Sequence, residues 1–553
     1  MVTDLGSRLR RLNEMSGRHI DTTSPLPSGA PPASARWWTL GIVTLATSML
    51  MIDLTSVNVA LPSVRSAFDI GNLADLQWVL DAYSLTLGVF LLTGGALADR
   101  YGRKSMFLLG FALFSAASLA CGLAWDGWSL NIARGIQGVG AAALFAIGPA
   151  LIAQEFSGKE RAQALGVFAA GYGVAIAGGP VVGGVLTQYL DWRWIFLVNV
   201  PLGIFAVIAG ALRIPDRGDR TPHANDWAGL ITFSVAMTML VFAILRGNTE
   251  GWGSTLIVGL FIASAIVLAV FVGIERARGP RALLDLSLFR IVSFDSLAAV
   301  TVLLMGSSLA AIFLLMSFVQ IELGHSPMAT GLRLLPMSAV MMVIGGVAGA
   351  LTAKVSPRWL LGIGSLAVGA GMISVPLLLK SDSSWTALLA NFLLIGVGMG
   401  IFNPTRAALA INVVEPARAG MSNGVSETFQ QIGVALGIAV FGSFFEARVA
   451  NHFAASEIGQ QIGSAAHDQG ETVAAAGSSV LGQLPDGIGP RAVSAAHSAV
   501  VDGLNNMMTV GAVLLAVAAV IGFAFTRNRD LHESWQDDVS DQATAQPLAD
   551  RVA

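Results

Sequence analysis

Asp53 is the residue of this chain whose position most needs a chemical explanation, because it lies inside a long apolar run that opens at Trp37. An ionised carboxylate in hydrocarbon costs about 3 kcal/mol or more, so such a residue normally faces a water-filled cavity or a partner. Desolvation also disfavours its charged form, which prepares the group to take up and release protons. We therefore predict a proton or cation site at Asp53. The alternative is a polar packing residue bonded to a neighbouring helix.

An arginine lies within another apolar run. Arg134 opens the stretch R-G-I-Q-G-V-G at residues 134–140, and at such a position it must pair or face water. If Arg134 lies near Asp53 or Asp81, its guanidinium and a proton compete for the same carboxylate, which would make a workable coupling device. The alternative is that Arg134 bonds only helix carbonyls.

Asp81 provides a second acid, in the stretch Q-W-V-L-D-A-Y-S-L at residues 77–85. Asp53 and Asp81 both fall in the outer part of their apolar runs, so both could line one cavity, where aromatic rings would attract an organic cation. Asp81 could instead be an interface residue in contact with water. Arg406 and Glu427 either pair with each other or line the cavity from the second half of the chain. The expected cavity residues are Asp53, Asn58, Trp78, Asp81, Tyr83, Arg406 and Glu427.

The composition places these residues in a membrane protein. Of 553 residues, 54% are hydrophobic and 12% are charged, whereas soluble domains carry about 25% charged residues. The net charge of −3 provides no basic face for nucleic acid, and the single Cys121 excludes an internal disulfide and a cysteine-based metal site. No catalytic constellation or Walker-type phosphate loop stands out in the sequence. We therefore expect no enzyme, no metal and no cofactor.

Fourteen apolar runs approach the roughly 20 residues that a membrane-spanning helix needs. The predicted spans are 37–64, 76–98, 105–124, 128–153, 162–187, 194–213, 227–246, 255–274, 295–321, 332–353, 359–379, 385–411, 422–446 and 504–526. Residues 447–503 are too polar to span, and we expect them to form a long outer segment that is partly helical and flexible.

Basic residues orient these spans. With a cytoplasmic N-terminus, the short inner loops hold fifteen Lys and Arg residues and the short outer loops hold five. Because cytoplasmic loops are enriched in Lys and Arg, we expect both termini to be cytoplasmic. Residues 95–104 also align weakly with residues 349–358, and internal repeats of this kind flank a midplane site in secondary transporters.

These patterns divide the chain into five segments. They are a disordered cytoplasmic tail (1–36), an N-terminal six-helix half (37–213), a linker with two additional transmembrane helices (214–290), a C-terminal six-helix half that includes the long outer segment 447–503 (291–526), and a second cytoplasmic tail (527–553).

The sequence G-A-L-A-D-R-Y-G-R-K at residues 95–104 resembles the short cytoplasmic loop after the second span of the major facilitator superfamily. Asp99 is placed to sit against the positive N-terminal end of another helix, and Gly102 permits a tight turn. The resemblance implies that this cluster latches the two halves when the cytoplasmic side is closed. The alternative is a simple positive anchor on the inner face. The latch residues are Gly95, Asp99, Arg100, Gly102, Arg103 and Lys104.

Two further motifs carry the same resemblance. The stretch at residues 134–140 is similar to the motif in which an arginine of the fourth span is tied to proton transfer. The stretch A-I-A-G-G-P-V-V-G-G at residues 175–184 looks like the motif of drug/proton antiporters, although Ala175 stands where a glycine is common. Proline removes a backbone hydrogen bond and glycines allow close helix contact, which suits a pliable gate, although packing alone is the alternative. The gate residues are Gly179, Pro180, Gly183 and Gly184.

The stretches at residues 52–62, 192–201 and 283–290, together with the extra pair of spans, resemble the fourteen-span drug/proton antiporter branch of this superfamily. The resemblance implies an all-α polytopic membrane protein with the major facilitator fold, built of two six-helix halves plus two extra transmembrane helices. We expect a monomer, surrounded by lipid in a bacterial inner membrane. It would expel hydrophobic drugs or antiseptics, with cations preferred, in exchange for protons by alternating access.

Two rival functions remain at this level. The first is the same machine with a dedicated cargo, such as a self-made antibiotic or a lipid-like metabolite, and the spans do not separate it from a multidrug exporter. The second is a non-transporting membrane scaffold, against which stand the charges within the spans.

Overall fold

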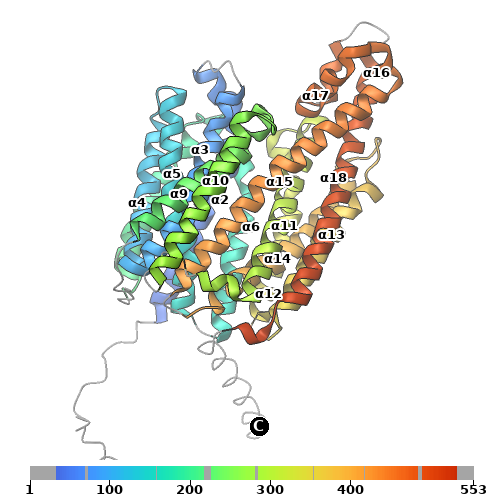
Figure 1. Cartoon of the computed structure of the whole chain (residues 1–553). Coiled ribbons are helices and arrows are strands. Elements are labelled where there is room, and N and C mark those ends of the chain that lie inside the picture. Colours follow the sequence, from blue (N-terminus) through green and yellow to red (C-terminus); the bar gives the residue numbers. More distant parts are fainter. Residues whose placement is uncertain are drawn as a thin grey trace, which may run out of the picture.

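The structure is a computed structural model, and it describes residues 33–68, 73–156, 158–216, 226–279, 284, 286–352, 354–415, 418–483 and 489–531. All regular elements in these residues are helices (Figure 1). We call the end of the bundle where α2 begins and α18 ends the basal end, and the end that carries α16 and α17 the apical end (Figure 1).

The first half of the bundle consists of α2 (Ala33–Phe68), α3 (Leu73–Tyr101), α4 (Arg103–Gly122), α5 (Gly127–Glu155), α6 (Gly158–Tyr189) and a sixth span split into α7 (Trp194–Leu197) and α8 (Asn199–Arg213). Local signals set several boundaries. Gly102, at a φ of 100°, separates α3 from α4, a conformation that favours glycine. Asp126 caps α5 by accepting a hydrogen bond from the backbone N–H of Ser129 at 2.7 Å.

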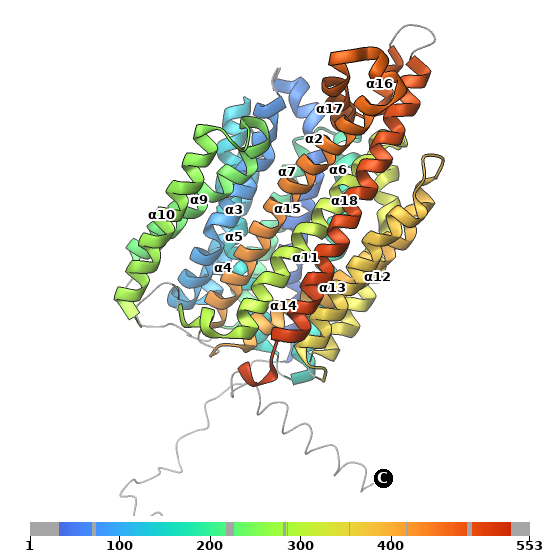
Figure 2. The same ribbon diagram turned by 45° about the vertical axis from the view of Figure 1, so that its right-hand side comes forward.

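A hairpin of two additional spans follows, α9 (Trp227–Glu250) and α10 (Thr255–Arg278). The side chains of Asp226 and Ser254 cap the two helices. The hairpin packs on the outside of the first half, where α9 contacts α3, and α9 also reaches α15 of the second half (Figure 2).

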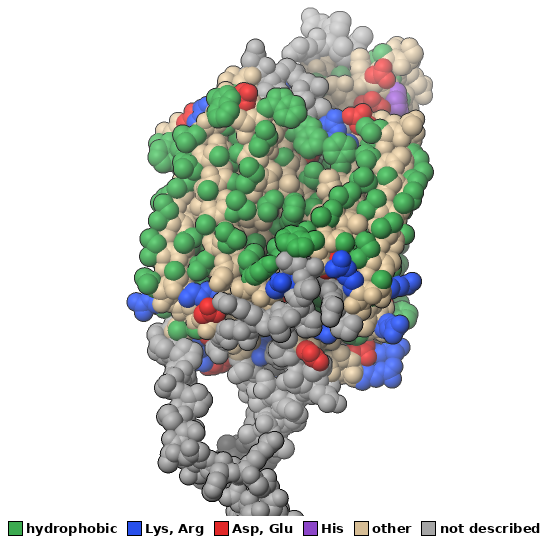
Figure 3. All heavy atoms as spheres, turned by 60° about the vertical axis from the view of Figure 1, so that its left-hand side comes forward, with side chains coloured by type: hydrophobic (Ala, Val, Ile, Leu, Met, Phe, Trp, Pro, Cys, Tyr) green, Lys and Arg blue, Asp and Glu red, His purple; other side chains and the backbone are tan. Residues whose placement is uncertain are grey.

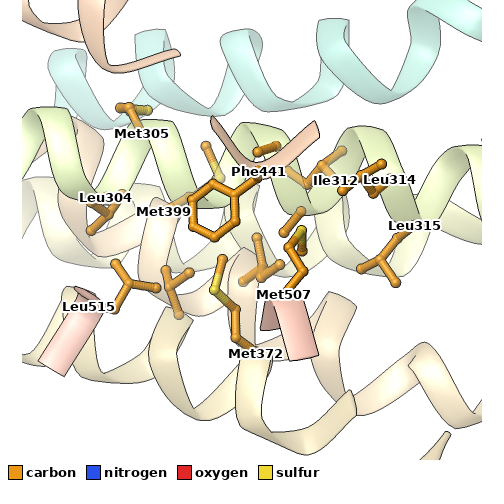
Figure 4. Close-up of a cluster of buried hydrophobic side chains, with 14 of the residues drawn as sticks. Leu304, Met305, Ile312, Leu314, Leu315, Met372, Met399, Phe441, Met507 and Leu515 are labelled. Carbon is orange, nitrogen blue, oxygen red and sulfur yellow. The ribbon is translucent and has the colours of Figure 1, made fainter. Parts of the chain in front are cut away.

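The second half consists of α11 (Val292–Ser317), which continues as a π-helical turn at Phe318–Glu322, then α12 (Pro327–Leu351), α13 (Pro357–Leu378), α14 (Leu389–Asn412), α15 (Ala419–Ala455) and α18 (Gly489–Phe525). Its core is a cluster of buried leucine, methionine and phenylalanine side chains contributed by several of these helices (Figure 4). Met507 and Met508 are fully buried there, so they serve packing.

Thirteen helices of the described residues are long and apolar enough to cross a membrane. A fourteenth is counted if the two pieces of α6, Gln163–Ile176 and Gly178–Tyr189, form one span bent by 42°. The bend lies where Pro180 lacks the N–H that would bond back along the helix. Apolar side chains cover the flank of the bundle as a broad band, with Lys and Arg gathered below it at the basal end (Figure 3). Exposed tryptophans mark the apical rim, with Trp125 80% and Trp128 78% exposed.

The outer segment at residues 447–503 is more helical than the sequence indicated. Helix α15 continues to Ala455, two short helices follow at α16 (Glu457–Ile462) and α17 (Ala466–Ala476), and α18 begins at Gly489. The predicted span 504–526 is therefore only the apolar part of a longer helix. Hydropathy locates the part of a helix that lies in lipid, and it does not detect the part that projects beyond it.

Candidate functional site

Asp53 of α2 and Arg134 of α5 form a fully buried ion pair. Arg134 Nη1 lies 2.5 Å from Asp53 Oδ2, and neither side chain has exposed surface. The guanidinium also donates from Nε to the backbone carbonyl of Val79 at 2.9 Å. Since taking charges out of water is expensive, such a pair persists only where each charge keeps its partner. Of the two acids that could meet Arg134, the structure places Asp53 there.

Neutral polar side chains complete the surroundings of this pair. Asp53 Oδ1 accepts hydrogen bonds from Gln137 Nε2 at 3.0 Å and from Asn199 Nδ2 at 3.3 Å. Both amides also donate to Ser118 Oγ, at 2.9 and 3.1 Å. Asp53 Oδ2 therefore accepts from α5, and Asp53 Oδ1 accepts from both α5 and α8.

Aromatic rings close the other side of Arg134. Its guanidinium carbon lies 4.3 Å from the centre of the Tyr83 ring and 5.6 Å from that of Phe196, distances that allow cation–π attraction. The sequence suggested that Tyr83 would face a ligand. In the structure its side chain is fully buried, and the Arg134 guanidinium lies over the face of its ring.

Trp78 and Asp81 lie toward the additional hairpin. The Trp78 ring packs on Phe242 of α9 at 5.6 Å between centres, and Arg246 of α9 lies 5.9 Å from the Trp78 ring. Arg246 is also the electrostatic partner of the half-buried Asp81. Asp53 and Asp81 therefore have different arginines as partners. The side chain of Asn58, the other predicted cavity residue of α2, lies outside the described residues.

A second buried ion pair lies in the other half. Arg406 Nη2 of α14 donates to Glu427 Oε1 of α15 at 2.6 Å, and Arg406 Nη1 donates to Ser426 Oγ at 3.0 Å. Of the two arrangements that the sequence allowed, the structure thus has these residues paired. Glu427 Oε2 is buried and accepts no hydrogen bond from any described residue. Tyr172 of α6, in the first half, lies close enough to interact electrostatically with both Glu427 and Arg406.

The two pairs lie near opposite ends of the bundle. Arg134 is close to the apical start of α5, whereas Arg406 is close to the basal end of α14. One acid–base pair thus lies in each half, at different depths.

Of the predicted latch residues, Asp99 and Gly95 contact the other half at the basal end. Asp99 Oδ1 accepts hydrogen bonds from Arg103 Nε at 3.0 Å and Nη2 at 2.8 Å, and Asp99 Oδ2 accepts one from the backbone N–H of Met421 at 2.8 Å. Met421 lies in the first turn of α15, so the expectation that Asp99 faces the N-terminal end of another helix is confirmed. Gly95 lets the helices approach, because a Cβ there would lie 2.5 Å from the Gly420 carbonyl oxygen. Lys104 Nζ donates to the Ala211 carbonyl at 2.8 Å.

Other contacts also close the basal end. Asn423 of α15 donates to the backbone carbonyl of Ala146 on α5 at 2.9 Å. Ala153, Ile411 and Ala419 form a small apolar cluster contributed by both halves. Gly166 of α6 also packs directly against the backbone of α12.

The predicted gate residues lie in the bent part of α6, which packs against both α2 and α12. Ser56 Oγ of α2 donates to the Gly179 carbonyl at 2.7 Å. A Cβ at Gly183 would lie 2.8 Å from Ser56 Cβ, whereas a Cβ at Gly184 would meet nothing within 4 Å. The bend therefore brings α6 close to the span that carries Asp53.

Ser118, Gln137 and Asn199 are the site residues to which the sequence led us to assign no role. Gln137 and Asn199 stood within motifs that we noted, at residues 134–140 and 192–201, and a polar side chain inside an apolar span was the available signal. Ser118 gave no signal, because serine is common in membrane helices and bonds readily to its own backbone.

Known proteins resemble the chain along most of its length. It is 29% identical over 521 residues to the tetracenomycin C resistance and export protein of Streptomyces glaucescens, covering 92% of this chain and 96% of the relative. It is 33% identical over 411 residues to the multidrug resistance protein Stp of Mycobacterium tuberculosis, covering 74% and 76%. It is also 28% identical to the multidrug efflux pump LfrA of Mycolicibacterium smegmatis, covering 91% and 98%.

Solved structures show the same fold. The proton:xylose symporter XylE superposes with a TM-score of 0.57 at 13% identity, covering 89% of this chain and 96% of the symporter. A bacterial homologue of the human lysosomal transporter Spinster, in an inward-facing conformation, gives a TM-score of 0.55 at 18% identity, covering 92% and 99%. The family model of the Major Facilitator Superfamily matches residues 43–438, and the chain is therefore a multi-pass membrane protein that belongs to this superfamily.

Proposed function

We propose that this protein is a proton-coupled efflux antiporter that exports hydrophobic compounds, with cations preferred, by alternating access. The observation that carries the proposal is the ion pair between Asp53 and Arg134, a carboxylate and a guanidinium held together without exposed surface. Relatives named as multidrug or antibiotic exporters support the direction of transport.

Coupling follows from competition for one carboxylate. A proton that binds Asp53 removes the charge that balances Arg134 and leaves a buried guanidinium without its partner. Losing one member of a buried pair costs about 3–5 kcal/mol, which is enough to shift a two-state equilibrium by roughly a hundredfold to several thousandfold. Protonation of Asp53 thus favours a conformation in which Arg134 gains other partners.

Contacts at the basal end support a position for this structure in the proposed cycle. The excess of Lys and Arg in the loops at that end supports a cytoplasmic orientation. With Asp99 bound to the first turn of α15, the chain is then closed toward the cytoplasm. A proton enters from outside, the basal contacts part, and cargo bound from the inside displaces the proton to the cytoplasm.

Glu427 is our candidate for the cargo-binding acid. Its Oε2 is buried and accepts no hydrogen bond from the described residues, and leaving such an oxygen unsatisfied costs free energy. A cationic cargo would supply the missing positive charge or donor. Tyr172 on the facing half adds an aromatic surface beside this acid.

A dedicated exporter is the second candidate. Two relatives favour it, because each is named for a single compound. They are the tetracenomycin C resistance and export protein and the probable actinorhodin transporter. Resistance profiling against dyes, quaternary ammonium compounds and antibiotics separates the two candidates, because a narrow profile identifies the dedicated exporter.

The decisive experiment uses purified protein in vesicles with an imposed proton gradient. We expect Asp53→Asn to abolish gradient-driven dye efflux at unchanged expression, and to abolish substrate-driven proton release in detergent. Asp468→Asn on the exposed face of α17 is the matched control and should behave as wild type. Unchanged efflux in Asp53→Asn would overturn the proposed mechanism.

A further inference from the structure

Three neutral side chains surround the buried acid of the first half and come from three different helices. Gln137 lies on α5, Ser118 lies on α4, and Asn199 is the first residue of α8. Asp53 itself lies on α2. All four are buried. A network of this kind is costly unless its members are satisfied, so its presence inside a membrane bundle requires an explanation.

The hydrogen bonds have a definite direction. Arg134 approaches Asp53 Oδ2, whereas Gln137 Nε2 and Asn199 Nδ2 both donate to Oδ1. Ser118 Oγ accepts from both amides, which holds their N–H groups toward the carboxylate. Hydrogen-bond donors to a carboxylate stabilise its negative charge, and here two amide N–H donors meet the same oxygen of Asp53.

Gln137 also contacts the opposite charge. Its Oε1 accepts a hydrogen bond from Arg134 Nη1 at 2.7 Å, while its Nε2 donates to Asp53. When Asp53 takes up a proton, Gln137 Oε1 and the Val79 carbonyl remain as acceptors for the guanidinium. One amide thus serves both members of the pair.

We infer that Ser118, Gln137 and Asn199 are positioning residues that set the affinity of Asp53 for its proton. The inference rests on the proposed function, since it concerns the same carboxylate. It adds residues that touch neither cargo nor solvent and act through Asp53.

The other groups around Asp53 are few in the described residues. Arg134 from α5, Tyr83 from α3 and Cys121 from α4 interact with it electrostatically. Helix α6 meets this part of α2 with Gly179 and Gly183, which bring no charge. The neutral network is therefore the element through which proton affinity can be changed without altering a charge.

The test measures substrate-driven proton release from detergent-solubilised full-length protein across a range of pH. We expect Ser118→Ala, Asn199→Leu and Gln137→Leu each to move the midpoint of release to higher pH. Gln137→Leu should move it by about one pH unit, a roughly tenfold gain in proton affinity, because it removes a donor to the carboxylate. Ser118→Thr keeps the hydroxyl and should restore the wild-type midpoint.

Ser115→Ala is the matched control. Ser115 lies one turn earlier on α4, is buried against Gly203 of α8, and its hydroxyl has no hydrogen-bond partner among the described residues. Its removal tests packing between α4 and α8 without touching the network, so its midpoint should equal that of the wild type.

Each outcome has one meaning. If the wild type releases no proton when substrate binds, the proposed function fails. If the wild type does release protons and the network variants keep its midpoint, only the positioning role is overturned. A shift in Ser115→Ala as large as that in Ser118→Ala would also overturn it, since packing would then explain both.

Discussion

Asp99 on α3 accepts a hydrogen bond at 2.8 Å from the backbone N–H of Met421, which lies in the first turn of α15 in the other half of the protein. Two further hydrogen bonds from Arg103 hold the same carboxylate. A negative charge at a helix N-terminus is stabilising, and more so where the site is partly buried. This link is therefore a charged contact between the halves at the basal end.

Asp99→Asn should weaken the closed basal end. The amide keeps a hydrogen-bond acceptor but loses the charge on which Arg103 and the helix dipole act. We expect a loss of about 1–2 kcal/mol, or roughly a five- to thirtyfold change in the ratio of closed to open protein. Hydrogen exchange of the amides at residues 419–424 should accelerate accordingly. Asp382→Asn, in an exposed apical turn, is the control, and equal exchange in both variants would argue against the latch.

The fold was largely predictable because a bilayer imposes a length and a polarity on each span. Apolar runs located the helices of both halves, and the motif at residues 95–104 correctly placed Asp99 against a helix N-terminus. The extensions of α15 and α18 beyond the predicted spans were not found, since alanine-rich polar helix and loop look alike to a hydropathy criterion.

The site was predictable only in part. A charged residue within an apolar run is easily recognised in a sequence. Asp53, Arg134, Arg406 and Glu427 could therefore be identified as candidate site residues. Their pairing could not be derived from the sequence. Either Asp53 or Asp81 could have been the partner of Arg134, and Arg406 could either pair with Glu427 or line the cavity. Ser118 and Asn199 come together only through the packing of α4 and α8 on the ion pair, which is a tertiary fact.

The glycines of the bent helix should differ sharply in their tolerance of a methyl group. A Cβ at Gly183 would lie 2.8 Å from Ser56 Cβ and 2.9 Å from the Ser56 carbonyl oxygen, whereas a Cβ at Gly184 meets open space. We expect Gly183→Ala to cost about 1–3 kcal/mol by overpacking and to impair efflux, because α6 is pushed away from α2. Gly184→Ala should be neutral or slightly stabilising.

Thermal unfolding in detergent, together with dye efflux, tests this contrast between adjacent residues. If Gly183→Ala unfolds at the same temperature and transports as well as Gly184→Ala, then close contact between α6 and α2 is not required, and the gate role of these glycines loses its support.

The pair between Arg406 and Glu427 allows structure to be separated from transport. Removing either partner alone leaves a buried charge and should destabilise the protein by about 3–5 kcal/mol, whereas the double change Arg406→Met with Glu427→Leu should restore much of the stability. If Glu427 binds cationic cargo, the double variant will be stable yet will still fail to export cations. Efflux of an uncharged dye should suffer less.

A double variant that regains both its unfolding temperature and its cation efflux would assign the pair a structural role alone. Measuring both quantities on the same preparations is essential, because a loss of efflux in either single variant could come from destabilisation.

The apical segment, by which we mean α16, α17 and the η7 turn at residues 457–483, is tied to the rest of the second half through Glu322, at the end of the π-helical turn that follows α11. The backbone N–H of Ser478 donates to Glu322 Oε2 at 3.0 Å, and the Ser478 hydroxyl donates to Oε1 at 2.5 Å. His497 of α18 places Nδ1 2.6 Å from the same carboxylate and Nε2 2.9 Å from the carbonyl oxygen of Ser381.

Both ring nitrogens of His497 therefore face acceptors. A neutral imidazole has one donor nitrogen, so the arrangement is fully satisfied only when the ring carries two protons. The contact between α18, the η7 turn at Ser478–Gln483 and the end of α11 should consequently tighten when His497 is protonated.

We predict that Glu322→Gln and His497→Gln each release the apical segment, and that raising the pH does the same in the wild type. Hydrogen exchange at residues 457–483, corrected for intrinsic rates, should rise several-fold in both variants, since charge-assisted hydrogen bonds are lost. His467→Gln alters an exposed histidine on α17 and should leave exchange unchanged. If exchange in the wild type does not depend on pH while Glu322→Gln still loosens the segment, the carboxylate holds it through Ser478 alone, and the charge on His497 contributes nothing to docking.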